Sequence, residues 1–196
     1  MPPSAFALGP RVPRRGNALL RLIGRTVLRA LRFSFAGVPP NVSRGVIVVA
    51  PHTSNWDFVL GCAVKFALDL DSYFLGKHTL FKGAWGRLMR WAGGIPVDRS
   101  APQGALAEVE AQFASRPAMM LALSPEGTRK HVDRWKSGFH RIARDAGVPI
   151  IPVAFDWARR EVVWFPVFEA TDDFEADQAA LRALYRPEMA RVPSGF

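Results

Sequence analysis

The sequence predicts an α/β fold whose central sheet is mostly parallel, or mixed, and is flanked by helices. Short runs rich in valine and isoleucine alternate with longer segments in which apolar residues recur at helical spacing. Polar loops directly follow several of these runs, as loops do at the carboxyl ends of parallel strands. With 196 residues, 49% of them apolar, the chain is long enough for one buried core.

The expected elements alternate along residues 39–190, which we interpret as a single α/β domain. Strands are expected at residues 45–50, 72–77, 95–98, 118–124, 148–155 and 161–168. Helices are expected at residues 58–68, 79–93, 101–116, 138–147 and 172–186. The strand at 148–155 contains Pro149 and Pro152, which favour a sheet edge or the start of a strand because proline cannot donate a hydrogen bond.

The N-terminal part of the chain differs from the rest in its charge. Residues 1–50 contain eight arginines and no acidic residue, and the net charge of the whole chain is +9. Residues 1–16 are rich in proline and arginine and are predicted to form a flexible tail. Residues 17–38 are predicted to form an amphipathic basic helix. The arginines of its polar stripe are Arg21, Arg25, Arg29 and Arg32, and its apolar face contains Leu20, Ile23, Val27, Leu31 and Phe35.

A broad apolar face beside an all-arginine stripe is typical of a helix that lies in a membrane interface, where arginines meet anionic headgroups. One alternative is a surface helix packed on the core. Another is a nucleic-acid-binding segment, which we disfavour because the basic residues lie on a leucine-rich helix without interleaved aromatic residues. We therefore expect a membrane-associating helix whose partner is a membrane surface with anionic lipid, and no nucleic acid.

The cysteine content and the lengths of the apolar segments predict where in the cell the protein lies. The single cysteine, Cys62, excludes an internal disulfide and suits a reducing compartment. The first sixteen residues lack the apolar core of a secretory signal, and no uncharged apolar run reaches the roughly 18 residues of a membrane-spanning helix. We expect a peripheral protein on the cytoplasmic face of a membrane.

A histidine and an aspartate follow the first predicted strand of the domain, in the stretch APHTSNWDF at residues 50–58. His52 lies just past the carboxyl end of the strand, where α/β proteins bind ligands. An aspartate that holds one imidazole nitrogen leaves the other nitrogen as a general base, and Asp57 is placed for this role. The alternative is a capping box, in which Ser54 and Asp57 begin the helix and His52 is a turn residue.

Two further loops at strand ends carry arginine. Residues 124–130, SPEGTRK, contain Pro125 and Gly127, which predict a turn, and Arg129, whose guanidinium suits a phosphate. Residues 93–100, GGIPVDRS, contain Arg99. The alternative for each loop is a charged surface turn in contact with solvent.

Together these stretches resemble the glycerolipid acyltransferase family, typified by 1-acylglycerol-3-phosphate acyltransferase. Residues 52–57 look like its HxxxxD block, 94–99 like its second block, 125–129 like its PEGTR block and 148–152 like its proline-containing fourth block. The resemblance covers about residues 45–156. The family often has asparagine where this chain has Pro51 and an aromatic residue where it has Ser124, and these departures leave the acceptor open.

The resemblance implies that a fatty acyl group passes from acyl-CoA or acyl carrier protein to a hydroxyl of a lysophospholipid, with 1-acylglycerol 3-phosphate as the default acceptor. His52 is then the general base and Asp57 holds its imidazole. The residues implied to bind the acceptor are Arg99, Glu126, Gly127, Thr128 and Arg129. The implied reaction uses no cofactor, and we expect no metal site. A thioesterase with the same pair of residues, or transfer to an acceptor lipid without phosphate, remains an alternative.

Overall fold

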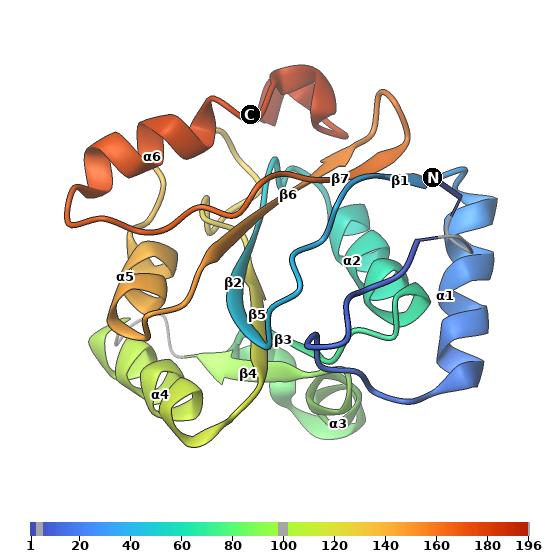
Figure 1. Cartoon of the computed structure of the whole chain (residues 1–196), viewed down its shortest axis with the longest axis horizontal. Coiled ribbons are helices and arrows are strands. Elements are labelled where there is room, and N and C mark those ends of the chain that lie inside the picture. The colour runs from blue at the N-terminus through green and yellow to red at the C-terminus, as the bar shows by residue number, and fades with distance from the viewer. Residues whose placement is uncertain (3–5, 98–101, 196) are drawn as a thin grey trace.

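The computed structural model describes residues 1–2, 6–97 and 102–195 (Figure 1). Its strands are β1 (Ser34–Gly37), β2 (Arg44–Val49), β3 (Ser72–Lys77), β4 (Gly94–Val97), β5 (Met119–Leu123), β6 (Ile150–Asp156) and β7 (Glu161–Trp164). Its α-helices are α1 (Ala18–Ala30), α2 (Asn55–Ala67), α3 (Gly83–Trp91), α4 (Pro102–Ser115), α5 (Gly138–Asp145) and α6 (Phe174–Arg182). Three short 3₁₀ helices are η1 (His78–Phe81), η2 (Pro187–Met189) and η3 (Pro193–Gly195).

The described strands form one sheet in the order β1-β7-β6-β2-β5-β3-β4. Strands β6 and β7 are antiparallel, and every other pair of neighbours is parallel. The predicted α/β class with a mostly parallel, mixed sheet is therefore confirmed. The carboxyl ends of β2 and β5 meet at one edge of the sheet, and this places the loops after them side by side.

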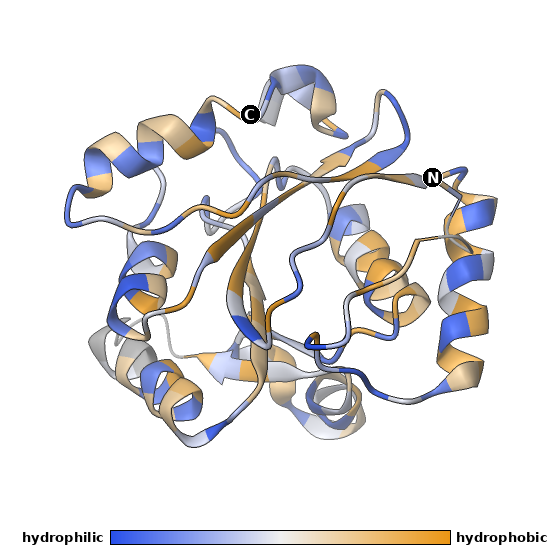
Figure 2. Cartoon of the chain, in the orientation of Figure 1, coloured by the Kyte–Doolittle hydropathy of each residue, from blue (hydrophilic) through white to orange (hydrophobic). Residues whose placement is uncertain are grey.

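Helices cover both faces of the sheet (Figure 1). On the α1 and α2 side, Leu60 packs in one apolar cluster with Ile47 of β2. On the α4 and α5 side, Phe113 packs in a second cluster with Val46, the neighbour of Ile47 along the same strand. Since successive side chains of a strand point to opposite faces, a Val/Ile-rich strand supplies both clusters. Figure 2 shows the result: the central strands are mostly hydrophobic and the surrounding helices alternate between hydrophobic and hydrophilic residues.

The predicted helix at 17–38 requires correction, because α1 ends at Ala30 and residues 34–37 are a strand. The chain leaves the helix through Arg32, whose φ is 61°. Phe33 and Phe35 are then both buried, with the less buried Ser34 between them, as the alternation of a strand requires. Strand β1 pairs with β7, so the α/β domain begins before residue 39.

The expectation of a flexible tail at residues 1–16 is also corrected for its described residues. Phe6, Leu8 and Val12 are buried in the cluster on the α1 and α2 side. The ring of Phe6 stacks on that of Phe35, with 4.5 Å between the ring centroids. The guanidinium of Arg14 donates a hydrogen bond to the carbonyl oxygen of Leu8. This segment therefore packs as part of the fold.

Helix α1 is docked on α2 and still exposes apolar side chains. A Cβ atom at Gly24 would lie 2.4 Å from the backbone nitrogen of Ala67, so the two helices touch backbone to backbone. This contact turns Gly24 and Leu28 inward and leaves Leu19 and Leu22 in solvent, 66% and 61% exposed. Within the described residues, none of the helices has both the length and the apolarity to cross a membrane.

Of the two alternatives for the prolines, the sheet edge is wrong, because β6 lies between β7 and β2, and the strand start holds for Pro149. Pro149 precedes the strand, and its carbonyl accepts a hydrogen bond from Val46. The carbonyl of Pro152 accepts one from Phe165, the residue just after β7. Pro152 lies just beyond the last paired residues of β6 and β7, Val153 and Trp164. A backbone N–H is not needed for strand pairing there, so the position tolerates proline.

Candidate active site

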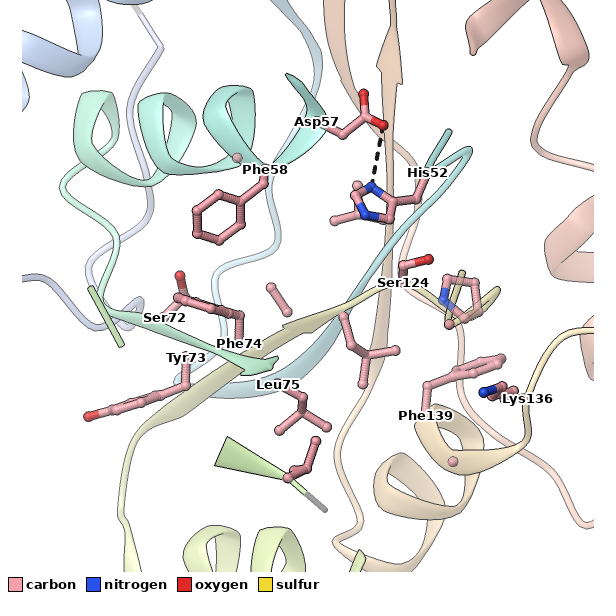
Figure 3. A pocket seen from close by; sticks show the side chains of 18 of the residues that line it. His52, Asp57, Phe58, Ser72, Tyr73, Phe74, Leu75, Ser124, Lys136 and Phe139 are labelled. Carbon is pink, nitrogen blue, oxygen red and sulfur yellow. Dashed lines mark ion pairs between the residues drawn. The ribbon is translucent and has the colours of Figure 1, made fainter. Parts of the chain in front are cut away.

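His52 and Asp57 lie together at the carboxyl end of β2 (Figure 3). The chain passes from β2 through residues 50–54 into α2, which begins with Ser54 as its N-cap; the Ser54 hydroxyl accepts a hydrogen bond from the backbone of Trp56. Asp57 is the third helical residue, and its Oδ2 lies 3.3 Å from Nδ1 of His52. Since Nδ1 faces Asp57, Nε2 is left for the cavity that His52 lines.

The Asp57 carboxylate is buried and has three N–H donors besides the imidazole. Its Oδ2 accepts hydrogen bonds from the backbone of Thr53 at 3.0 Å and of Ser54 at 2.8 Å. Its Oδ1 accepts one from the indole nitrogen of Trp157 at 2.8 Å. The capping box is thus present, and so is the contact with His52: one carboxylate serves both. Hydrogen bonds from N–H groups to a buried carboxylate are strong and fix its orientation.

Glu126 does not lie where the resemblance implies. Its side chain is buried, and its Oε2 accepts hydrogen bonds from the backbone N–H of His52 at 2.9 Å and from the Ser124 hydroxyl at 3.1 Å. Burial raises the pKa of the Glu126 carboxyl, and these two hydrogen bonds oppose the rise. The carboxyl is not among the groups that line the cavity, and its two hydrogen bonds hold the His52 loop in place.

The next three residues of the turn do face the cavity. Gly127, Thr128 and Arg129 line it, and Arg129 is exposed at its mouth. Gly127 has a φ of 65°, which disfavours any residue with a Cβ atom. Such a Cβ would also lie about 3 Å from the end of the Lys136 side chain. Glycine thereby lets Lys136 lie across the turn.

Lys136 is a cavity residue that sequence reasoning missed. Its backbone N–H donates a hydrogen bond of 2.9 Å to the carbonyl of Pro125, and its side chain lines the cavity with Arg129. The two cations therefore line the same cavity, Arg129 from the turn and Lys136 from the segment that is hydrogen-bonded to it. Lys136 directly follows the buried Trp135 and precedes α5. In the sequence it is a single lysine just before a helix. Such lysines are common on protein surfaces, so the sequence does not mark Lys136 as a cavity residue.

The cavity has a volume of about 840 Å³ and extends from His52 to the far end of β3. Its walls are mostly aromatic and aliphatic. At its far end lies Lys65, whose ammonium donates hydrogen bonds to the carbonyl oxygens of Ser72 and Ala92. Burial lowers the pKa of Lys65 to about 8. A cavity of this size, apolar except for a few polar groups, is the usual form of a small-ligand site.

The C-terminal segment supports the site from outside, a feature with no signal in the sequence. The backbone N–H of Val192 donates to the Thr53 hydroxyl at 3.1 Å. The guanidinium of Arg191 lies between two indoles, 4.5 Å from the ring centre of Trp157 and 4.9 Å from that of Trp56. Cation–π contacts of this kind hold the residues beside His52 in position.

Two expectations remain outside these observations. Arg99 lies outside the residues that the structure describes. For metals, no group of three or more His, Cys, Asp or Glu side chains in residues 1–2, 6–97 and 102–195 is arranged to hold an ion.

Comparison with known proteins adds independent information. A family model described as acyltransferase matches residues 27–156, which contain both the His52–Asp57 pair and the turn around Gly127. The 1-acyl-sn-glycerol-3-phosphate acyltransferase of Streptococcus pneumoniae is 31% identical over 118 residues. That alignment covers 59% of this chain and 43% of the relative, so the chain spans less than half of the relative's length.

A solved structure shares the fold. The crystal structure of the 1-acyl-sn-glycerophosphate (LPA) acyltransferase from Thermotoga maritima matches with a TM-score of 0.61. The match covers 85% of this chain and 75% of that one, at 19% sequence identity. At this identity the similarity shows a common α/β architecture.

Proposed function

This chain belongs to the acyltransferase family, and on that premise we propose that it transfers a fatty acyl group from an acyl thioester to a hydroxyl of a lysophospholipid in phospholipid biosynthesis. The donor is acyl-CoA or acyl carrier protein, and the acceptor is 1-acylglycerol 3-phosphate. One observation carries the proposal: Nδ1 of His52 lies 3.3 Å from Oδ2 of Asp57 at the wall of a large apolar cavity. A general base and room for acyl chains thus adjoin each other.

In the proposed reaction, Nε2 of His52 takes the proton of the acceptor hydroxyl while that oxygen attacks the thioester carbonyl carbon. The tetrahedral intermediate expels the thiolate, which takes the same proton back from the imidazolium as a thiol. Asp57 stabilises the imidazolium and fixes the ring. General-base catalysis of this kind contributes about 10²–10⁴-fold. No cofactor takes part, since the thioester is itself the activated co-substrate.

The acceptor phosphate is assigned to the cations at the cavity mouth. Arg129 offers a planar, permanently charged guanidinium, and Lys136 offers an ammonium from the segment hydrogen-bonded to the same turn. The backbone of Gly127 and the hydroxyl of Thr128 border the same space. Arg99 stays a candidate for this role from the sequence alone. An acceptor without phosphate would make no use of Arg129 and Lys136, and this favours a phosphorylated acceptor.

We place the enzyme on the cytoplasmic face of a membrane with anionic lipid. Helix α1 exposes Leu19, Leu22 and Ile23 next to arginines, and no acidic residue occurs in the first 50 residues. Helix α3 exposes Trp85, Leu88 and Trp91 and is also free of acidic residues. Arg15, which precedes α1 in the chain, contacts α3: its guanidinium lies 5.0 Å from the Trp91 ring centre and donates a hydrogen bond to the Trp91 carbonyl. Apolar residues rimmed by cations suit such a membrane surface.

The test is thiol release from long-chain acyl-CoA on anionic liposomes, with and without a panel of lysolipids and monoacylglycerol. We expect release that depends on lysophosphatidate and is lost in His52→Ala, while circular dichroism of the variant is unchanged. Release without any acceptor would instead indicate a thioesterase. Full activity of His52→Ala would rule out the proposed mechanism.

A further inference from the structure

The cavity lies on both faces of the sheet. Ala122 and Phe155, which line it, pack in the apolar cluster on the α2 side. Leu75, Leu123 and Phe139, which also line it, pack in the cluster on the α5 side. The cavity therefore has two arms, which we call the α2 arm and the α5 arm. Figure 3 shows Ser72 and Phe74 on one side of β3, where Phe58 also lies, and Tyr73 and Leu75 on the other.

The two arms meet because the sheet opens between β3 and β5. The paired residues of these strands run from Ser72 opposite Met120 only as far as Phe74 opposite Ala122. Beyond this point each strand keeps its other neighbour: β5 stays paired with β2 through Leu123, and β3 with β4 through Lys77. Leu75 and Leu123 therefore border an opening at the same end of the sheet as His52.

The arms differ in their polar groups. The α2 arm is walled by residues such as Phe58 and Phe74, and its charged group is the buried Lys65 at its far end. The α5 arm is walled by Val109, Phe139 and Ile142. Lys136 directly precedes α5 and lies beside Phe139 in Figure 3, and Arg129 lines the cavity from the turn to which the Lys136 backbone is hydrogen-bonded. A phosphate held by these two cations would therefore lie beside the α5 arm.

We propose that the α5 arm binds the acyl chain of the phosphorylated acceptor and that the α2 arm binds the acyl chain of the donor, and this assignment rests on the proposed function. The phosphate, the acyl chain and the reacting hydroxyl of a lysophosphatidate all belong to one glycerol. A phosphate at Arg129 and Lys136 therefore brings the acceptor chain to the α5 arm. The thioester must reach His52 from the other side, along the α2 arm. The volume of about 840 Å³ lies in the upper part of the range of ligand pockets, roughly 300–1,000 Å³.

One glycine in each arm provides a matched pair of test positions. Gly138, at the start of α5, lines the cavity, and a Cβ atom there would meet nothing within 4 Å. Gly61 of α2 also lines the cavity, and its Cβ would lie 3.7 Å from the Phe155 ring, an ordinary contact. Leucine at either position narrows one arm, and leucine is a better helix former than glycine. Gly104→Leu, at an exposed position of α4 with nothing within 4 Å, is the control.

The experiment measures binding by calorimetry, without turnover, for lysophosphatidates and for unreactive acyl-thioether analogues of acyl-CoA, each over a series of chain lengths. We expect Gly138→Leu to weaken long-chain lysophosphatidate roughly tenfold and to leave short chains and all donor analogues unchanged. Gly61→Leu should weaken long-chain donor analogues by a similar factor and leave the acceptors unchanged. Gly104→Leu should match the wild type throughout.

The proposal is overturned if Gly138→Leu leaves the chain-length dependence of lysophosphatidate binding unchanged, because the acceptor chain then lies elsewhere, for example in the bilayer. It is also overturned if both variants weaken the donor analogues alone. A failure of the proposed function gives another result: the two variants differ from the wild type in ligand binding as expected, but the wild type transfers no acyl group. If the wild type transfers an acyl group and the two variants bind both ligands as the wild type does, only the assignment of the arms is contradicted.

Discussion

The indole nitrogen of Trp157 donates a buried hydrogen bond of 2.8 Å to Oδ1 of Asp57, although 100 residues separate the two in the chain. It reaches the oxygen that does not face His52, so the two sides of the carboxylate are held by different partners. The indole itself is fixed by an edge contact with Phe33, at 5.0 Å between ring centroids, and by Arg191 above its face. Trp157 thereby acts as a positioning residue for the His52–Asp57 pair.

We predict that Trp157→Phe lowers kcat roughly tenfold and leaves the KM values for donor and acceptor within about twofold. The ring is retained and only the N–H is lost, and a hydrogen bond to a charged group contributes about 1.5–3 kcal/mol. Steady-state kinetics with both substrates varied provides the measurement. If Trp157 had only a structural role, Trp157→Phe would lower the thermal stability but would not lower kcat at unchanged KM values.

The matched control is Trp164→Phe. Trp164 is also buried, and its indole nitrogen has no hydrogen-bond partner among the residues that the structure describes. Removing this N–H should leave kcat unchanged. An equal loss of kcat in both variants would show that the contact of Trp157 with Asp57 has no special role.

Arg129→Ala and Lys136→Met should each raise the KM for lysophosphatidate about tenfold and change that for monoacylglycerol little. The expectation follows from the loss of one charged partner of a phosphate, an interaction of about 1.5–3 kcal/mol. Initial rates with the two acceptors at a fixed donor concentration provide the measurement. Lys130→Met is the control, because Lys130 is exposed on the same turn and is not among the residues that line the cavity. Equal effects on both acceptors would contradict the phosphate assignment.

The parts of the site that the sequence predicted are local in the chain. His52 and Asp57 are joined by one strand–turn–helix connection, so their spacing alone limits how they meet. The turn at Gly127 was likewise predicted from its own residues. Trp157 and Lys136 belong to separate elements, and their places depend on how the sheet assembles. The direction of Glu126 also depends on a distant group, the backbone N–H of His52.

The error at β1 has a physical cause as well. Val27, Leu31 and Phe35 are spaced four residues apart, which fits a helix, while Phe33 and Phe35 are spaced two apart, which fits a strand. Both periods fit the same residues. Strand pairing with β7, from Ser34 opposite Glu161 onward, decides between them, and this partner lies more than 100 residues away.

Leu22→Glu and Ile23→Glu together should reduce binding to anionic vesicles by a factor of ten or more, since each replaces an exposed apolar side chain of α1 by an acid facing anionic lipid. Co-sedimentation with vesicles of mixed neutral and anionic phospholipid measures the effect. Val167→Glu is the control, because Val167 is 44% exposed but lies after β7, away from α1. Unchanged binding of the double variant would show that α1 does not contact the membrane.

The buried Lys65 gives the protein a predictable pH dependence of stability. Burial and, to a smaller extent, the nearby Arg15 charge lower its pKa to about 8, and Asp71 opposes the change. The unfolded chain keeps this proton up to its ordinary pKa of about 10.4, so between pH 8 and that value the unfolded state holds more protons than the folded state. The free energy of unfolding therefore rises with pH across this window, by about 3 kcal/mol for this group.

Lys65→Met should remove this contribution. Denaturant unfolding at a series of pH values from neutral to alkaline gives the free energy of unfolding for each protein, and subtraction of the variant's curve cancels the other titrating groups. The difference should change by about 3 kcal/mol in favour of the wild type as the pH rises. Lys82→Met, at an exposed lysine, should parallel the wild type. Parallel curves for the wild type and Lys65→Met would mean that the ammonium is solvated, and hence that water reaches the far end of the α2 arm.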